Sequence, residues 1–192
     1  MRPVSAGGES GVRSASVLVA STRAAEGVYP DRAGPIIVEW LRDRGYAVGA
    51  PVVVPDGDAV GAALRTALAG TVADGPVADG AVGGPVDDAG KLAGVPEVVL
   101  TSGGTGIAPT DTTPEQTAPL IERPVPGLAD AIRRAGLPAV PTAVLSRGLA
   151  GVSGSSLVVN LPGSTGGVRD GLAVLADVLE HAVEQLRGGD HR

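Results

Sequence analysis

Short apolar runs alternate with amphipathic stretches along most of the chain. Continuous runs of valine, leucine and alanine predict strands buried on both faces, and apolar residues three or four positions apart predict helices. The predicted strands cover residues 15–20, 46–54, 98–100 and 157–161, and the predicted helices cover residues 33–44, 59–69, 114–122, 128–135 and 166–186. The alternation predicts an α/β fold with a mostly parallel sheet and helices on both faces.

The segments between these elements are rich in glycine, proline and small polar residues. They predict a disordered N-terminal tail (1–14), a flexible insertion (71–94), a short extended piece (140–145), a turn (148–156) and a frayed C-terminal tail (188–192). We therefore expect one domain over residues 15–187, which is long enough to bury a sizeable core.

Polar residues and glycines follow the ends of all four predicted strands. These residues are Ser21–Arg23, Asp56, the segment Ser102–Asp111 and the turn Pro162–Ser164. Parallel α/β sheets bind ligands at the carboxyl ends of their strands. We therefore expect the candidate residues to converge on one edge of the sheet.

The stretch from Thr101 to Gly106 has the strongest local signal for a ligand. Its three glycines remove side chains where a backbone would approach a ligand closely, and its hydroxyls and N–H groups can donate to an anion. Thr113 is predicted to cap the next helix, with Pro114 as its first residue. The spacing matches neither a Walker loop nor the dinucleotide fingerprint, so a phosphate site and an ordinary glycine turn remain equally open on this stretch alone.

Two aspartates are candidates for binding a divalent cation. Asp56 and Asp111 each follow a predicted strand, and hard cations take oxygen ligands. The alternative for Asp56 is that it, or Asp58, caps the following helix. Arg23 is either an anion contact or a solvated loop residue.

Charge and composition exclude several classes of function. The net charge of −6 argues against a broad nucleic-acid or anionic-membrane surface. The chain has no cysteine, and its two histidines, His181 and His191, lie near the C-terminus, so a cysteine or histidine site is poorly supported. It has neither a membrane-length apolar stretch nor a signal-peptide core, so we expect a cytoplasmic location.

Several motifs occur in an order that resembles a known family. They are the opening stretch Val19–Pro35, TSGGTG (101–106), D-x-T-P-E (111–115), PGLADAIR (126–133), LSRG (145–148) and NLPGS (160–164). Together they resemble the molybdopterin-binding family of molybdenum-cofactor biosynthesis, which includes bacterial molybdopterin adenylyltransferases and the gephyrin G domain. The resemblance runs from about Ala15 to Leu186.

The resemblance implies a three-layer α/β/α fold, a homotrimer and a site for molybdopterin. In the adenylyltransferases, the terminal phosphate of molybdopterin attacks the α-phosphate of ATP with Mg²⁺, giving adenylyl-molybdopterin and pyrophosphate. A molybdate-inserting protein that takes over the product is a further partner to which the resemblance points, and whether molybdate insertion involves this chain stays open. Such chemistry depends mainly on positioning and charge neutralisation, so the lack of cysteine is no obstacle.

Site residues follow from the same resemblance. Asp56 and Asp111 match the family's two aspartates, which implies catalytic and Mg²⁺-binding roles. The implied phosphate- and substrate-binding residues are Ser102, Gly103, Gly104, Thr105, Gly106, Glu115, Ser146, Arg147, Pro162, Gly163 and Ser164. Ser146 and Arg147 would hold anionic groups. Glu115 would either accept from the pterin N–H groups or act as a helix-terminal acid.

One departure bears on the catalytic prediction. Thr110 stands where many relatives have arginine, which removes a positive charge beside the phosphates. An enzyme is favoured because both aspartates are retained. The alternatives are a non-catalytic molybdopterin-binding or assembly protein of the same family, and an unrelated nucleotide-binding α/β protein.

Overall fold

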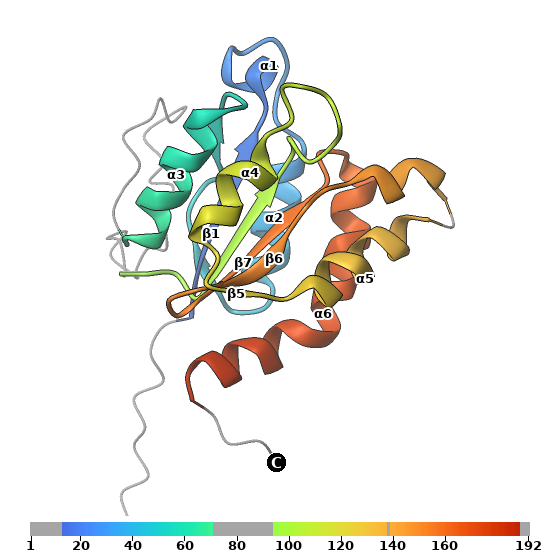
Figure 1. Ribbon diagram of the computed structural model, residues 1–192. Coiled ribbons are helices and arrows are strands. Elements are labelled where there is room, and N and C mark those ends of the chain that lie inside the picture. The colour runs from blue at the N-terminus through green and yellow to red at the C-terminus, as the bar shows by residue number, and fades with distance from the viewer. Residues whose placement is uncertain (1–12, 71–93, 138, 189–192) are drawn as a thin grey trace, which may run out of the picture.

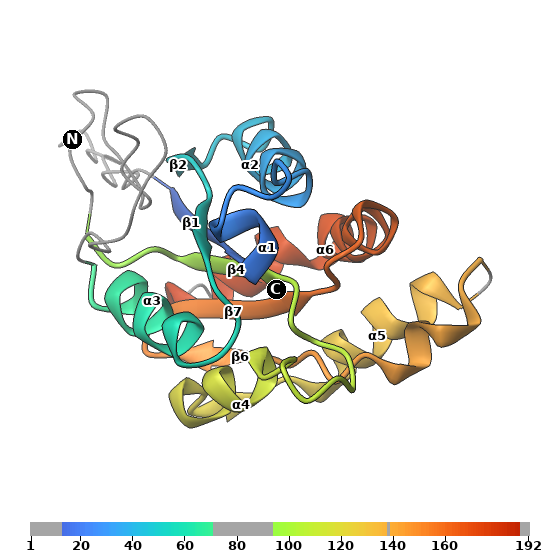
Figure 2. The same cartoon turned by 90° about the horizontal axis from the view of Figure 1, so that it is seen from above.

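A mixed sheet runs through the middle of the molecule, and helices cover both of its faces (Figures 1 and 2). The computed structural model describes residues 13–70, 94–137 and 139–188, and in these ranges the sheet has seven strands. They are β1 (Ser14–Ala20), β2 (Ala47–Val48), β3 (Val52–Val54), β4 (Val98–Ser102), β5 (Arg123–Pro124), β6 (Ala150–Ser153) and β7 (Ser156–Leu161). The order is β2-β1-β4-β7-β6-β5, with β3 also paired to β1. The predicted three-layer α/β/α fold is confirmed.

The central strands β1, β4 and β7 are parallel and completely buried. Their burial on both faces explains the unbroken apolar runs in the sequence. Ser102 of β4 pairs with Val19 of β1 and with Leu161 of β7, so the three strands end side by side. The loops that follow them therefore emerge together at one edge of the sheet, as predicted.

Two helical layers enclose the sheet. One face carries α2 (Ala33–Arg42), α5 (Pro126–Gly136) and α6 (Thr165–Leu186), and the other carries α3 (Asp58–Leu68), α4 (Thr113–Thr117) and the 3₁₀ helix η2 (Ala118–Leu120). The short helix α1 (Thr22–Ala25) lies at the carboxyl edge (Figure 1). No helix in the described ranges is long and apolar enough to cross a membrane.

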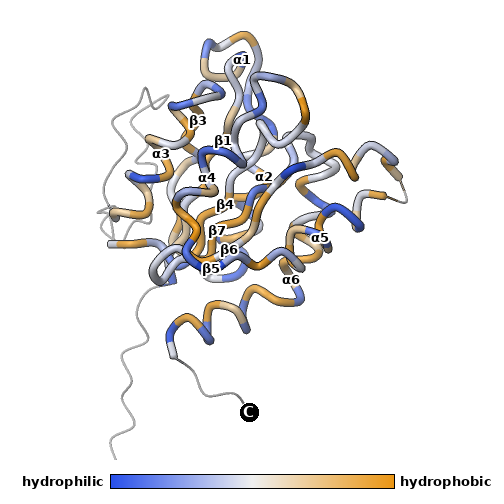
Figure 3. Tube along the Cα trace, in the orientation of Figure 1, coloured by the Kyte–Doolittle hydropathy of each residue, from blue (hydrophilic) through white to orange (hydrophobic). Residues whose placement is uncertain are grey.

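Small aliphatic side chains fill both layers of the core. Leu64 of α3 and Leu175 of α6 are fully buried on opposite faces of the sheet. Figure 3 shows apolar residues concentrated along β4, β7 and β6. Because the sequence contains no phenylalanine, close layering of valine and leucine takes the place of aromatic packing.

The predicted strand over residues 46–54 is wrong in its continuity. The chain forms β2 and β3 as two short strands, both parallel to β1, with the break at residues 49–51. Pro51 has no N–H to donate to a neighbouring strand, which explains why the ladder is interrupted there. Ser14, assigned to the N-terminal tail from sequence, is the first residue of β1.

The region between residues 114 and 156 also differs from the prediction. The predicted helix 114–122 ends early, and Arg123–Pro124 forms the edge strand β5. Pro126 starts α5 instead of separating two helices, and residues 141–145 form the 3₁₀ helix η3 (Pro141–Leu145) instead of an extended piece. The predicted turn 148–156 contains β6, which is antiparallel to β5 and β7.

Gly151 explains why β6 resembles a turn in the sequence. A Cβ at this position would lie 2.9 Å from the backbone oxygen of Arg123 and under 3.0 Å from the Ile121 side chain. The glycine therefore permits close approach of a neighbouring strand. Residues 1–12 of the N-terminal tail, residues 71–93 of the predicted insertion, and residues 189–192, which include His191, lie outside the described residues.

A charged cluster joins the amino ends of β1 and β4 to the end of α6. Arg13 forms an ion pair with Glu180, lies 4.7 Å from the Tyr46 ring centroid and donates to the Tyr46 hydroxyl at 3.3 Å. Arg187 forms a second ion pair with Glu97. Burial raises the pKa of the Tyr46 phenol to about 12, although Arg13 lowers it. This end of the sheet lies opposite the loops described below.

The raised pKa of Tyr46 predicts an alkaline loss of stability. Because the folded-state pKa lies above the ordinary value of 10.0, the stabilisation is complete below pH 10 and is lost as pH rises toward 12. We expect the wild-type free energy of unfolding to fall by about 1–2 kcal/mol over this interval relative to a Tyr46→Phe variant. Urea unfolding of both proteins at pH 9, 10.5 and 11.5 measures it, and parallel pH profiles would contradict it.

Candidate functional site

A cavity of about 780 Å³ lies at the carboxyl edge of the sheet. The loops after β1, β3, β4 and β7 line it, as the convergence of strand ends predicted. The predicted site residues in its wall are Asp56, Ser102, Gly103, Gly104, Asp111 and Gly163. We call it the larger cavity.

A smaller cavity of about 280 Å³ shares Gly163 with the larger one as a lining residue. Helix α5, η3 and the start of α6 form its other walls. The predicted site residues that line it are Thr105, Gly106, Ser146, Pro162, Gly163 and Ser164. The predicted set is therefore divided between two neighbouring spaces, and Glu115 and Arg147 line neither of them.

The glycine loop passes very close to other parts of the chain. Gly103 has φ +93°, and a Cβ there would lie under 3.0 Å from the backbone oxygen of Ala20. Gly104 has φ +60°, and its Cβ would lie under 3.0 Å from Thr113 Oγ1 and 3.2 Å from Asp56 Oδ1. A side chain at either position would be strained and obstructed. The two glycines thus allow the loop to lie between the end of β1 and the start of α4.

The Asp56 carboxylate is held from the end of β1. Its Oδ2 accepts from the Thr22 backbone N–H at 3.0 Å and from the Thr22 hydroxyl at 2.8 Å, and the Asp56 N–H donates to Thr22 Oγ1 at 3.1 Å. Helix α3 begins after Gly57 with no side-chain cap, so the alternative that Asp56 caps it is wrong. Asp58 accepts from Gln116 Nε2 at 3.1 Å and lies outside the larger cavity.

Asp111 closes a tight turn beside the glycine loop. Its N–H donates to the Ala108 oxygen at 2.9 Å, and its Oδ2 accepts from the Ala108 N–H at 3.3 Å. A Cβ at Gly106 would lie 2.6 Å from Asp111 Oδ2, so this glycine too admits the carboxylate. The geometry brings Asp56 and Asp111 into one cavity wall from two different strand ends.

Thr113 has a different role from the predicted one. It is the first residue of α4 and gives no side-chain cap, while its N–H donates to the Gly104 oxygen at 3.0 Å. Its hydroxyl is buried, and none of the described residues is its hydrogen-bond partner. This hydroxyl and Asp56 Oδ1 flank the space that the missing Gly104 side chain leaves. Sequence reasoning missed it, because burial without a partner is visible in three dimensions alone.

These oxygens fit a magnesium ion. The donors beside Gly104 are carboxylate and hydroxyl oxygens, which are the ligands that Mg²⁺ prefers. No group of three or more His, Cys, Asp or Glu side chains gathers in the described ranges. Such a site supplies few protein ligands, and Mg²⁺ ordinarily completes its shell with water and substrate phosphates.

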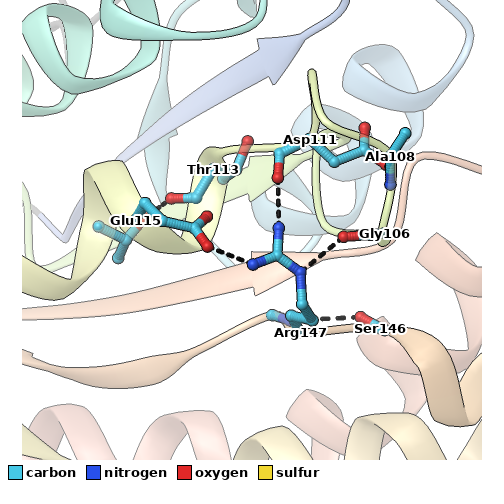
Figure 4. Close-up of polar contacts among 9 residues, drawn as sticks. Gly106, Ala108, Asp111, Thr113, Glu115, Ser146 and Arg147 are labelled. Atoms are coloured by element: carbon cyan, nitrogen blue, oxygen red, sulfur yellow. Dashed lines mark hydrogen bonds and ion pairs between the residues drawn. The ribbon is translucent and has the colours of Figure 1, made fainter.

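Arg147 faces Glu115, Gly106 and Asp111 with its guanidinium (Figure 4). Arg147 Nε donates to the Gly106 oxygen at 2.7 Å, Nη2 donates to the Asp111 oxygen, and Nη1 forms an ion pair with Glu115. Hydrogen bonding to Arg147 lowers the pKa of Glu115. In this structure Arg147 therefore contacts the protein's own oxygens instead of facing either cavity.

Three serines of the predicted site also contact protein atoms. Ser102 donates to the Pro162 oxygen at 2.9 Å, which fastens β4 to the turn after β7. Ser164 caps α6 by accepting from the Gly167 N–H at 3.1 Å. Ser146 donates to Thr105 Oγ1 at 3.4 Å. The amino end of α6 borders both cavities, and the dipole of a helix favours an anion at its amino end.

A buried polar network supports the loop from below. Asn160 donates through Nδ2 to the hydroxyls of Thr101 and Thr117, both at 3.0 Å, and its Oδ1 accepts from the Leu149 N–H at 3.0 Å. It joins β7, β4, α4 and the segment before β6. We assigned Asn160 no role from sequence, although an asparagine inside the apolar strand LVVNL is a signal of such a network.

The wall of the larger cavity also contains Arg23, whose role the sequence left open, and two residues, Tyr29 and Arg32, for which it predicted none. Arg23 lies 5.1 Å from the Tyr29 ring centroid, and both line the cavity with Arg32. Asp31, also in the wall, accepts from the N–H groups of Ala33 and Gly34 at the start of α2. Thr110 lies in the same wall. Two arginines thus border the cavity in which Thr110 adds no charge.

Comparison with known proteins gives a consistent family. The probable molybdopterin binding domain family matches residues 86–181. The chain is 32% identical over 162 residues to the molybdopterin adenylyltransferase of Haemophilus influenzae, covering 82% of this chain and 70% of that protein. The structure of the molybdopterin biosynthesis Mog protein from Mycobacterium ulcerans has 50% identity and a TM-score of 0.75, covering 92% of this chain and 98% of that one.

Longer relatives share the same region. The chain is 33% identical over 177 residues to the molybdenum cofactor biosynthesis bifunctional protein of Synechococcus elongatus. This match covers 92% of the chain and 48% of the relative, so the chain spans about half the length of that protein. On the family match, the identities and the shared fold, this chain belongs to the molybdopterin-binding domain family.

Proposed function

We propose that this chain is a molybdopterin adenylyltransferase. The terminal phosphate oxygen of molybdopterin attacks the α-phosphorus of ATP, a new P–O bond forms, and pyrophosphate leaves. The observation that carries the proposal is the pair Asp56 and Asp111, brought from two strand ends into the wall of one cavity beside a glycine loop. The cavity volume of about 780 Å³ is of the size that ligand sites have.

Mg²⁺, when bound, supplies positive charge that neutralises the phosphates as the new bond forms. Asp56 Oδ1 and Asp111 would hold it, with the buried Thr113 hydroxyl beside them. The contacts of Thr22 fix the Asp56 carboxylate before substrate binds. A ligand set fixed in advance loses little order on binding.

Backbone N–H groups and arginines would neutralise the negative charge of the substrate phosphates that Mg²⁺ leaves. The glycine loop approaches the cavity without side chains, and the amino end of α6 borders both spaces. Arg23 and Arg32 line the same wall as Thr110. We propose that they supply the cationic charge that an arginine at position 110 would otherwise provide.

The two cavities suit two substrates that must meet. We propose that molybdopterin and ATP occupy these neighbouring spaces, with the reacting phosphates near Gly163, which lines both. We also propose that the chain forms a homotrimer. We further propose that the product passes to a molybdate-inserting protein, and the bifunctional relative from Synechococcus elongatus, of which this chain covers 48%, supports this transfer. The proposal also includes one domain over residues 15–187 and the phosphate- and substrate-binding roles that the family resemblance implies for the other site residues.

A pyrophosphate-release assay tests the reaction. Purified protein receives ATP and Mg²⁺ with and without molybdopterin, and mass spectrometry identifies the product. We expect release that depends on the pterin, together with adenylyl-molybdopterin. Tight molybdopterin binding without release, beside an active homologue as the control, would instead favour the binding-only alternative.

A further inference from the structure

One arginine side chain spans the whole segment between the glycine loop and α4. Arg147 contacts Gly106 and Asp111, the first and last residues of this segment, through their backbone oxygens. Its third contact, with Glu115, lies in the first turn of α4. Its own N–H also donates to the Thr105 oxygen at 2.7 Å. Figure 4 shows the guanidinium between these partners.

The segment that Arg147 spans has little other support. Residues 107–110 are exposed and belong to no helix or strand. Within the segment, the bonds between Asp111 and Ala108 close a single turn. An exposed turn of this kind opens at low free-energy cost unless contacts from outside hold it. The hydrogen bonds that the backbone oxygens of Gly106 and Asp111 receive from outside the segment come from Arg147.

We propose that Arg147 is a positioning residue that fixes the 106–111 segment and thereby aims Asp111 into the larger cavity. Glu115 keeps the guanidinium in place by pairing with its third nitrogen. The proposal rests on the proposed function as far as Asp111 acts in adenylylation. It assigns Arg147 a role other than the anion contact that the family resemblance implied.

The shape of the guanidinium suits this role. A planar fork with five N–H donors reaches three acceptors in fixed directions, whereas a lysine ammonium acts as a compact point charge. Arg133 of α5 extends the arrangement, because it donates to the oxygens of Ser146 and Gly148 on either side of Arg147. The backbone that carries Arg147 is thus itself held in place.

Hydrogen exchange tests the proposal without any substrate. We expect Arg147→Gln to speed amide exchange in peptides covering residues 105–111 by about tenfold or more. Arg147→Lys should restore little of the protection, and Glu115→Gln should give a smaller increase because both backbone contacts remain. Arg134→Gln removes the same charge from a nearby exposed arginine and is the matched control. Exchange in Arg147→Gln within twofold of wild type would overturn the proposal.

Steady-state kinetics tests the link to Asp111. We expect Arg147→Gln to lower kcat by about 30-fold or more while the KM for ATP changes less than about threefold. An anion-binding role predicts the reverse: weaker molybdopterin or ATP binding that Arg147→Lys largely restores. That result, or faster exchange with an unchanged kcat, would overturn the positioning role. If wild type itself releases no pyrophosphate, the proposed function fails, while the exchange experiment still decides whether Arg147 holds the segment.

Discussion

Replacing Gly103 by alanine is expected to lower the free energy of unfolding by about 3 kcal/mol or more. The new Cβ would lie under 3.0 Å from the backbone oxygen of Ala20 and would require φ near +93°. Neither obstacle can be relieved by turning a side chain, because the opposing atom belongs to the end of the buried strand β1. Urea unfolding at pH 7 measures the loss as a lower midpoint at constant m-value.

Gly154 provides the matched control for this prediction. It also has positive φ, +56°, but a Cβ there would meet nothing within 4 Å. Gly154→Ala should therefore cost about 1–2 kcal/mol, which is the conformational penalty alone. Equal losses in the two variants would show that the close approach of the glycine loop to β1 does not limit the structure.

The parts of the fold that sequence predicted are those with strong local signals. The strands β1, β4 and β7 are buried on both faces, so an apolar run is nearly their whole requirement. Helix α6 repeats apolar residues over 22 residues, and Ser164 begins it as a cap. Given parallel strands, convergence of the loops at one edge follows from topology.

The parts that sequence did not predict depend on contacts between distant segments. Gly151 has the composition of a turn, yet it lies in β6 because Ile121 and Arg123 approach it closely. The break between β2 and β3 follows from pairing with β1 on both sides of Pro51. Local propensity is a weak guide where packing of this kind decides the outcome.

The same distinction applies to the site. The sequence predicted which residues lie at the carboxyl edge of the sheet, but it did not predict what each side chain contacts there. Arg147 and its partners are separated by more than 30 residues in sequence, and an arginine near a phosphate loop suggests an anion contact when its neighbours are unknown. The sequence around Thr113 is typical of a helix cap, whereas the burial of its hydroxyl beside Gly104 and Asp56 depends on contacts with distant segments.

These contacts hold the two aspartates of the site in different ways. Asp56 is held after the end of β3 by Thr22, which lies two residues after the end of β1 and begins α1. Asp111 lies at the end of an exposed segment whose outside support comes from Arg147. We therefore expect changes outside the cavity to affect Asp111 more than Asp56. Substituting the two carboxylates themselves tests whether both act in the reaction.

Asp56→Asn and Asp111→Asn are each expected to lower pterin-dependent pyrophosphate release by about 100-fold or more at saturating ATP and Mg²⁺. Each substitution removes a negative oxygen ligand while keeping the side-chain shape, so the amide oxygen at position 56 can still accept from Thr22. Molybdopterin binding should change less than about threefold. The concentration of Mg²⁺ for half-maximal activity should rise about tenfold or more. At position 56 the amide NH₂ group, which is no metal ligand, replaces the oxygen beside Gly104, and at position 111 an amide is a weaker ligand than a carboxylate.

Asp58→Asn is the matched control for these two variants. Asp58 lies two residues from Asp56, but its carboxylate accepts from Gln116 and does not line the larger cavity. The control loses the same charge and should keep activity within about threefold of wild type. If Asp56→Asn and Asp111→Asn turn over like wild type, neither carboxylate holds the metal, and the cavity would then serve binding alone. Asp56 and Asp111 line the larger cavity and Asp58 does not. If all three variants lose activity equally, the loss of a negative charge explains the effect, and the position in the cavity does not.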